Sequence, residues 1–337
     1  MSATRGRRVD PLPLIDERPL RSVRENRPVA LFTHAAAWDA LGGALDLPVA
    51  WRAEPTDATE EAFRAFARDI PAEVAAIYAV GGGLPVDAAK LAAHQRGLPL
   101  VAVPTALSVD AHLTPASGIR RDGCVFYIPT GAPRRLIVDW EVIAAAPPWV
   151  RAAGLGDVLS IATGLHDWRF AEDHGRNAPG HEWQPWAAAV AGALLDEAIR
   201  VAPAAGAGQQ AGLSRLLDLL AMEVQLCNLL GHSRPEEGSE HAFAYSVENL
   251  TGHGLPHGDL VGPGILALAA AQGQETRPLR EALLASGARL DRSPVAAARA
   301  TLESLGEYAV RHGLPFGMAH ALDPDRVDRA LAACWQR

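Results

Sequence analysis

The stretch AAIYAVGGGLPVDAAK, residues 75–90, decides the fold class of this chain. Its apolar first part is typical of a buried strand, three glycines follow, and a helical pattern comes next. Glycines at such a turn let the backbone approach a pyrophosphate, and the helix N-terminus offers it free N–H groups. The glycines match neither the dinucleotide-binding motif GxGxxG nor the P-loop motif GxxxxGK[ST]. A tight strand–helix turn that binds no ligand is therefore an equally open interpretation.

The same stretch contains Lys90, the only lysine in a chain that otherwise uses arginine for every positive charge. Lys90 lies three residues after Asp87, on the same face of the expected helix. One interpretation is a surface ion pair of little energetic value. The other is a compact ammonium placed where a guanidinium would not fit.

The residues on either side of this stretch continue the alternation of strands and helices. Alternation of this kind predicts a parallel sheet with crossover connections, here a Rossmann-like α/β domain. Turn formers are frequent between residues 105 and 130, and FYIP within that segment suggests a hairpin. We expect strands at 29–32, 75–80, 98–104 and 134–140, and helices at 60–70, 87–97 and 141–150. Residues 8–28, rich in Pro and Arg, fit no element of the pattern.

From about residue 150 the periodicity becomes helical throughout, and no convincing strand follows Trp140. We therefore predict an α/β dinucleotide-binding domain over 1–149 and an all-helical domain over 150–337, with a ligand site in the cleft between them. A small-residue loop is expected at 203–212. The clearest helical segments are 186–202, 213–231, 239–250, 260–273, 294–313 and 325–335.

Composition narrows the class of protein. A formal net charge of −8 argues against nucleic acid or an anionic membrane as a partner. The three cysteines form no CxxC pair, so neither a disulfide framework nor a cysteine zinc site is indicated. No run of about 18 apolar residues occurs, which favours a cytoplasmic protein.

Three residues from separate segments could form a metal site. Asp157 in GLGDVLS lies near the start of a helix, His241 in GSEHAF lies on another with Ser239 as a plausible N-cap, and His257 in GLPHGDLVG precedes a third. One carboxylate and two imidazoles with an open fourth position are the arrangement of a catalytic zinc. Each residue also has a plain structural interpretation: a helix cap, a core histidine and a loop histidine.

These motifs occur in the order GGG…D..K, VPTALSVDAHLTPASGI, GLGDVLS, GSEHAF and LPHGDLVG, and this series resembles the metal-dependent polyol dehydrogenases. Those enzymes form one superfamily with iron-containing alcohol dehydrogenases and dehydroquinate synthase. GSEH and PTALSVD are most similar to glycerol-1-phosphate dehydrogenase, and residues 99–164 also resemble glycerol dehydrogenase. The resemblance covers about residues 75–265.

The resemblance implies roles for individual residues. A divalent metal, Zn²⁺ or alternatively Fe²⁺ or Ni²⁺, would be held by Asp157, His241 and His257, and Asp110 would bind substrate hydroxyls. The cofactor, NAD or NADP, would be contacted by Gly81, Gly82, Gly83, Leu84, Pro85, Thr105, Ser108 and Thr114, with Asp87 and Lys90 matching family positions after the glycines. The implied enzyme interconverts a small polyol or polyol phosphate and its ketone by hydride transfer, as a homo-oligomer.

The sequence departs from the glycerol-1-phosphate enzymes at several positions. Leu84 replaces a serine that usually follows the glycines. Tyr245 replaces a second histidine that usually lies one turn after His241 and faces the substrate, so we assign the catalytic role of that histidine to Tyr245. His253, four residues before His257, could fill that role from the loop, and the other interpretation is a solvated loop histidine. The alternative activity is a carbocycle-forming synthase of the dehydroquinate synthase kind, which uses NAD transiently. The single lysine and an aspartate as first metal ligand speak against the synthase. Thr33 and His34 at the end of the first strand leave NADP open as the cofactor.

Overall fold

The computed structural model describes residues 9–252, 255–292 and 295–335. Its first half contains a six-stranded sheet in which all pairings are parallel. This confirms the predicted α/β class. The strands, in spatial order, are β1 (Leu14–Glu17), β8 (Arg135–Val138), β5 (Leu100–Pro104), β4 (Ala76–Gly81), β2 (Val29–Thr33) and β3 (Val49–Ala53).

The central strands are buried on both faces, which is why they are continuous apolar runs in the sequence. Ala30, Phe32, Ile77 and Ala79 point to one face, and the residues between them point to the other. Helices α2 (Glu60–Asp69) and α3 (Gly83–Arg96) pack on the first face. Helix α1 (Ala35–Ala40) and the 3₁₀ turn η1 (Leu20–Ser22) cover the second.

The two edge strands did not follow from the sequence. β1 lies within the Pro- and Arg-rich segment and pairs only with β8, and β3 pairs only with β2. Most residues of both strands are partly or fully exposed, so neither carries a continuous apolar run.

The predicted hairpin is present between residues 105 and 130. Strands β6 (Ala116–Arg121) and β7 (Cys124–Pro129) pair antiparallel. Asp122 and Gly123 connect them with φ of 52° and 75°, the left-handed conformations that a two-residue hairpin turn of this kind requires. The hairpin packs its β6 strand against α3, and β7 contacts α10 (Ser239–Thr251) of the helical half.

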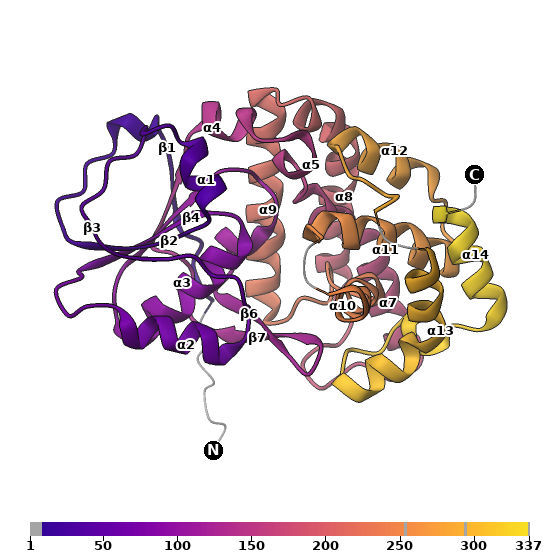
Figure 1. The fold of residues 1–337 in the computed structure, drawn as a ribbon. Helices are drawn as coiled ribbons and strands as arrows, with labels where there is room; N and C mark the ends of the chain where they lie inside the picture. The colour runs from indigo at the N-terminus through magenta and orange to yellow at the C-terminus, as the bar shows by residue number, and fades with distance from the viewer. Residues whose placement is uncertain (1–8, 253–254, 293–294, 336–337) are drawn as a thin grey trace, which may run out of the picture.

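Helices make up the rest of the chain, as predicted (Figure 1). The six clearest predicted helices of this half are present, and so is the short helix expected at Asp157. Two longer helices, α7 (Ile161–Asp173) and α12 (Arg277–Ser286), were not predicted. No strand follows Val138 among the described residues. Besides α10, the helices are α4 (Trp140–Ala145), α5 (Pro148–Arg151), α6 (Leu155–Leu159), α7 (Ile161–Asp173), α8 (Pro185–Gly206), α9 (Gln210–Leu230), α11 (His257–Ala271), α12 (Arg277–Ser286), α13 (Val295–His312) and α14 (Pro324–Trp335), with 3₁₀ turns η2 (Asp110–His112) and η3 (Met318–Ala321).

The predicted loop at 203–212 is wrong over most of its length. Helix α8 continues to Gly206, with Pro203 inside it, and α9 begins at Gln210. The small residues serve close packing, because a Cβ added to Gly206 would lie 1.8 Å from the backbone oxygen of Ala285. Only residues 207–209 connect the two helices.

The two halves share a hydrophobic core. Ala102 of β5 and Leu136 and Val138 of β8 belong to the same buried cluster as the helices of the second half. In Figure 1 the sheet and the helical half therefore lie side by side, with α9 on the side of the helical half that faces the sheet. No helix in the described parts of the chain is both long enough and apolar enough to span a membrane.

Candidate metal and dinucleotide site

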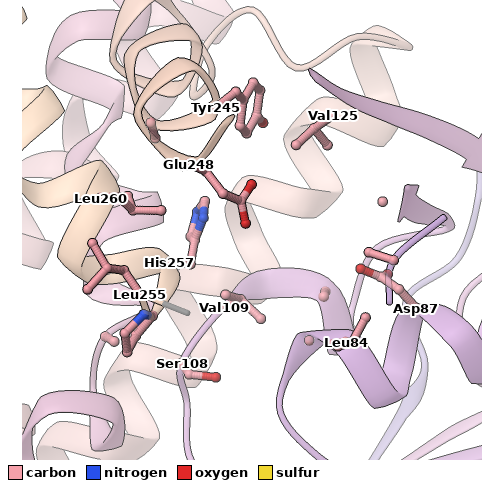
Figure 2. Close-up of a pocket in the computed structure, with 18 of the residues that line it drawn as sticks. Leu84, Asp87, Ser108, Val109, Val125, Tyr245, Glu248, Leu255, His257 and Leu260 are labelled. Carbon is pink, nitrogen blue, oxygen red and sulfur yellow. The ribbon is translucent and has the colours of Figure 1, made fainter. Parts of the chain in front are cut away.

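A cavity of about 400 Å³ lies where the two halves meet. One wall comes from the segments that follow the carboxyl ends of β4 and β5, the usual ligand-binding edge of a parallel sheet. The hairpin β6–β7 forms a second wall, and α10, the start of α11 and the residues before it form the third. Figure 2 shows Leu84, Asp87 and Ser108 on one side of this cavity and Tyr245, Glu248 and His257 on the other.

The three residues predicted to bind a metal lie together. Asp157 comes from α6, His241 from α10 and His257 from the first position of α11, and one ligand atom from each lies within 4.8 Å of the others. His257 Nε2 is 3.1 Å from Asp157 Oδ1. Asp157 and His241 are buried, whereas His257 reaches the cavity. No other group of three such donors is this compact among the described residues.

A second carboxylate orients His241. Its Nδ1 lies 2.8 Å from Oε1 of Glu240, a fully buried residue that also accepts the backbone N–H of Gly238 at 2.7 Å. With Nδ1–H donated to Glu240, Nε2 is the nitrogen left to bind a ligand. The carboxylates of Glu240, Glu237 and Asp157 outweigh burial and raise the pKa of His241 to about 9, so this position favours positive charge.

Buried Asp167 fixes the start of the helix that carries His241. Its carboxylate accepts the backbone N–H of Ser239 at 2.7 Å, the backbone N–H of Met318 at 2.8 Å and the amide of Gln272 at 2.8 Å, besides the Ser239 hydroxyl. Ser239 is therefore not the N-cap that its sequence position suggested. Helix α10 starts at Ser239, Gly238 precedes it, and the serine hydroxyl donates to Asp167.

The glycine turn connects a strand to a helix, as the sequence predicted. β4 ends at Gly81, whose φ of 131° is open only to glycine, and α3 begins at Gly83. A Cβ added to Gly83 would lie 3.2 Å from Cγ2 of Val109. Any larger residue at position 83 would therefore crowd Val109 and reduce the space in front of the N-terminus of α3. Nε2 of the buried His112 ring lies 2.9 Å from the carbonyl oxygen of Gly81, and this contact links the turn to η2.

The other positions assigned to the cofactor divide into two groups. The cavity is lined by Gly83, Leu84, Asp87 and Ser108. The described residues that line it do not include Gly81, Gly82, Pro85, Lys90, Thr105 or Thr114.

Lys90 is a buried structural link between α3 and the loop before β6. Its Nζ donates to the Ala111 carbonyl at 2.9 Å, to Thr114 Oγ1 at 3.0 Å and to the Ala116 carbonyl. It also pairs with Asp87 Oδ1 at 2.9 Å. The pair with Asp87 is therefore present, but the lysine is only 1% exposed, so the interpretation as a surface pair is wrong and burial supports the compact ammonium interpretation. An ammonium directs its three N–H groups from one small atom toward these closely spaced acceptors, whereas the N–H groups of a guanidinium are spread over a larger, rigid plane.

The two residues assigned to substrate chemistry reach the cavity from opposite walls. Asp110 lines it from η2, and its backbone N–H donates to Asp157 Oδ2 at 3.1 Å. The surrounding protein and the Asp157 carboxylate raise the pKa of Asp110 to about 7. Tyr245 donates to Glu237 Oε1 at 2.7 Å, and burial beside that carboxylate holds its pKa well above the usual range, so it stays a hydrogen-bond donor. His253 lies outside the described residues.

Sequence reasoning missed four polar or charged residues that line the cavity: Thr56, Arg120, Tyr127 and Glu248. The Tyr127 hydroxyl lies 2.9 Å from that of Tyr245. A signal for Glu248 was available, because residues 241, 245 and 248 share one face of a helix. No comparable signal marked Arg120 and Tyr127, since only the hairpin brings them to the helical half.

The broader similarities are to a protein family and to two solved structures. Residues 24–147 match the family model of iron-containing alcohol dehydrogenases. The fold is that of a probable glycerol dehydrogenase from Sinorhizobium meliloti 1021, with a TM-score of 0.71, 19% identity and 98% of both chains covered. Glycerol dehydrogenase from Schizosaccharomyces pombe has the same fold, with a TM-score of 0.67, 18% identity and coverage of 98% of this chain and 91% of that one.

Curated relatives are more specific. The chain is 33% identical to glycerol-1-phosphate dehydrogenase [NAD(P)+] of Methanothrix thermoacetophila over 70% of its own length and 65% of the relative's. It is 35% identical to the enzyme of the same name from Thermofilum pendens, over 64% of its length and 62% of the relative's. The chain thus spans somewhat less than two thirds of these relatives, and the resemblance predicted from the motifs is confirmed.

Proposed function

We propose that this protein is an NAD(P)-dependent, metal-dependent dehydrogenase that interconverts a small polyol or polyol phosphate and its ketone. The proposal rests on the convergence of Asp157, His241 and His257 beside a cavity that His257 lines and that also borders the N-terminus of α3. The names of the curated relatives and the matched family support the same class of reaction.

The donor set fits a divalent metal. Two imidazoles and one carboxylate suit Zn²⁺, with Fe²⁺ or Ni²⁺ as alternatives, and the excess of carboxylates around His241 favours a cation there. A metal bound by these residues would supply Lewis acidity, lowering the pKa of a substrate hydroxyl. A bound nicotinamide would supply the hydride acceptor or donor.

The chain's own residues would bind and orient the reactants. The glycine turn and the start of α3 would hold the cofactor pyrophosphate, with Leu84 and Ser108 against the rest of the dinucleotide. Asp110 would accept a hydrogen bond from a substrate hydroxyl. Tyr245 would keep its hydroxyl oriented through Glu237 at the opposite wall.

This proposal includes three further statements. The boundary between the dinucleotide-binding and metal-binding halves lies at residues 149 and 150, the protein is a homo-oligomer, and it acts in the cytoplasm. Light scattering on the purified protein tests the assembly, and cell fractionation tests the location.

Metal analysis combined with a substrate screen tests the proposed function. Purified protein is loaded with Zn²⁺, Fe²⁺ or Ni²⁺ and assayed with polyols, polyol phosphates and ketones by the nicotinamide absorbance. A dehydrogenase changes the amount of NADH or NADPH in step with substrate. Conversion without a net change would indicate the carbocycle-forming synthase instead, and activity that survives alanine at all three metal positions would refute the proposal.

A further inference from the structure

An ion pair forms part of the cavity wall. Arg120 of β6 donates from Nε to Glu248 Oε2 at 2.8 Å and from Nη2 to Glu248 Oε1 at 3.2 Å. Both residues line the cavity, and their side chains are 27% and 15% exposed. Figure 2 shows the Glu248 carboxylate directed into the cavity beside His257. A two-point contact between a guanidinium and a carboxylate fixes both groups.

Positive charge for an anionic substrate group is scarce at this site. Among the described residues that line the cavity, Arg120 is the only arginine or lysine, while Asp87, Asp110 and Glu248 are carboxylates. Lys90 is not available, because its ammonium is bonded inside the protein. A phosphate reaching Arg120 would have to displace Glu248 and then lie beside that carboxylate, and like charges at short range repel.

The same lining suits hydroxyl groups. Carboxylate oxygens of Glu248 and Asp110 accept hydrogen bonds, and the Ser108 hydroxyl both donates and accepts. The Tyr127 hydroxyl can accept, because Tyr245 donates its own proton to Glu237 and therefore takes the proton of Tyr127. A polyol without phosphate offers several O–H donors to these acceptors. Sites that pair buried polar groups with substrate hydroxyls discriminate strongly against ligands that leave those groups unpaired.

We infer that Glu248, held in place by Arg120, makes this site selective for an unphosphorylated polyol. Glu248 accepts hydrogen bonds from hydroxyls away from the reacting carbon and keeps Arg120 from binding a phosphate. The inference rests on the proposed function and narrows its substrate class. It also departs from the substrate in the names of the curated relatives.

The test compares substrates on the metal-loaded enzyme with its nicotinamide cofactor. We expect kcat/KM for glycerol or a four- or five-carbon polyol to exceed that for glycerol 1-phosphate by about tenfold or more. Glu248→Ala, which frees Arg120, should lower kcat/KM for the polyol and raise it for glycerol 1-phosphate, each by about tenfold. Adding Arg120→Met to Glu248→Ala should abolish the gain with the phosphate.

Glu60→Ala is the matched control. Glu60 pairs at 2.8 Å with Arg121, the neighbour of Arg120 on β6, and neither Glu60 nor Arg121 lines the cavity. This variant should keep both kcat/KM values within about twofold. Binding of glycerol 1-phosphate, followed calorimetrically with the cofactor-loaded wild type and Glu248→Ala, gives a readout independent of turnover and should be tighter in the variant.

Three results would overturn the inference. The wild type could prefer glycerol 1-phosphate, or Glu248→Ala could lose both substrates equally while its thermal midpoint stays near that of the wild type. An equal affinity of the wild type and the variant for glycerol 1-phosphate would also contradict it. If no substrate of either kind changes the nicotinamide absorbance, the proposed dehydrogenase itself fails, and this inference fails with it.

Discussion

Replacing Lys90 with methionine should destabilise the fold by roughly 3–4 kcal/mol, because the substitution leaves buried acceptors without their donor. The carbonyls of Ala111 and Ala116 would lose a charged partner, and the single proton of the Thr114 hydroxyl could reach only one of them, at 3.3–3.4 Å. Each poorly satisfied group costs about 1–3 kcal/mol. Asp87 would lose its ion pair, but its side chain is 18% exposed and cavity water can hydrate part of it. The total therefore falls at the lower end of the range for a broken buried pair, about 3–5 kcal/mol.

Urea unfolding of the wild type and variant measures this difference, and the midpoint should fall with little change in slope. Asp87→Asn combined with Lys90→Met should be less destabilised than Lys90→Met alone, since no carboxylate is then left unpaired. Arg64→Met is the control: Arg64 pairs with Glu60 on an exposed helix face, and its loss should cost no more than about 0.5 kcal/mol. A Lys90→Met variant within about 1 kcal/mol of the wild type would refute the reasoning.

Three further predictions concern the metal site and the effect of pH. His257→Ala should lose its bound divalent metal on dialysis, with activity reduced by at least about a hundredfold, and elemental analysis that still finds one metal per chain would contradict the ligand assignment. Glu240→Gln should weaken metal affinity by about 10–100-fold in a chelator competition, because His241 loses the carboxylate that orients it; an unchanged affinity would show that this contact does not matter. Burial, with His181 and Arg234 nearby, lowers the pKa of His232 to about 4, so the protein should lose stability as the pH falls from about 6.5 towards 4, by roughly 1–3 kcal/mol. His232→Asn should lessen that loss in urea titrations at pH 7 and pH 4.5, and equal losses in both proteins would rule out His232 as the cause.

The fold could be predicted where burial was complete. β2, β4 and β5 are covered on both faces, so their sequences are unbroken apolar runs bounded by glycine or proline. β1 and β3 could not be found in this way, because exposed edge strands are held by backbone hydrogen bonds to their neighbours, which leave little trace in side-chain type. The segment 203–212 was wrongly predicted to be a loop because glycine and alanine are common both in loops and where helices pack closely. Here the close approach of the Ala285 backbone to Gly206 in the folded protein requires the small residue.

By itself, the sequence determined the strand–glycine–helix turn at residues 75–90. It left Asp157, His241 and His257 as one open interpretation, which the resemblance to the metal-dependent polyol dehydrogenases then favoured. The turn is a local choice of residue type, made by backbone conformation, whereas the three donors have only the side-chain chemistry in common until the fold brings α6, α10 and α11 together. Only the tertiary structure decided the role of Lys90, whose acceptors lie 21 to 26 residues further along the chain. It also decided that Arg120 meets Glu248, 128 residues away, at the cavity wall. Such contacts depend on which surfaces pack together, and no residue carries that information alone.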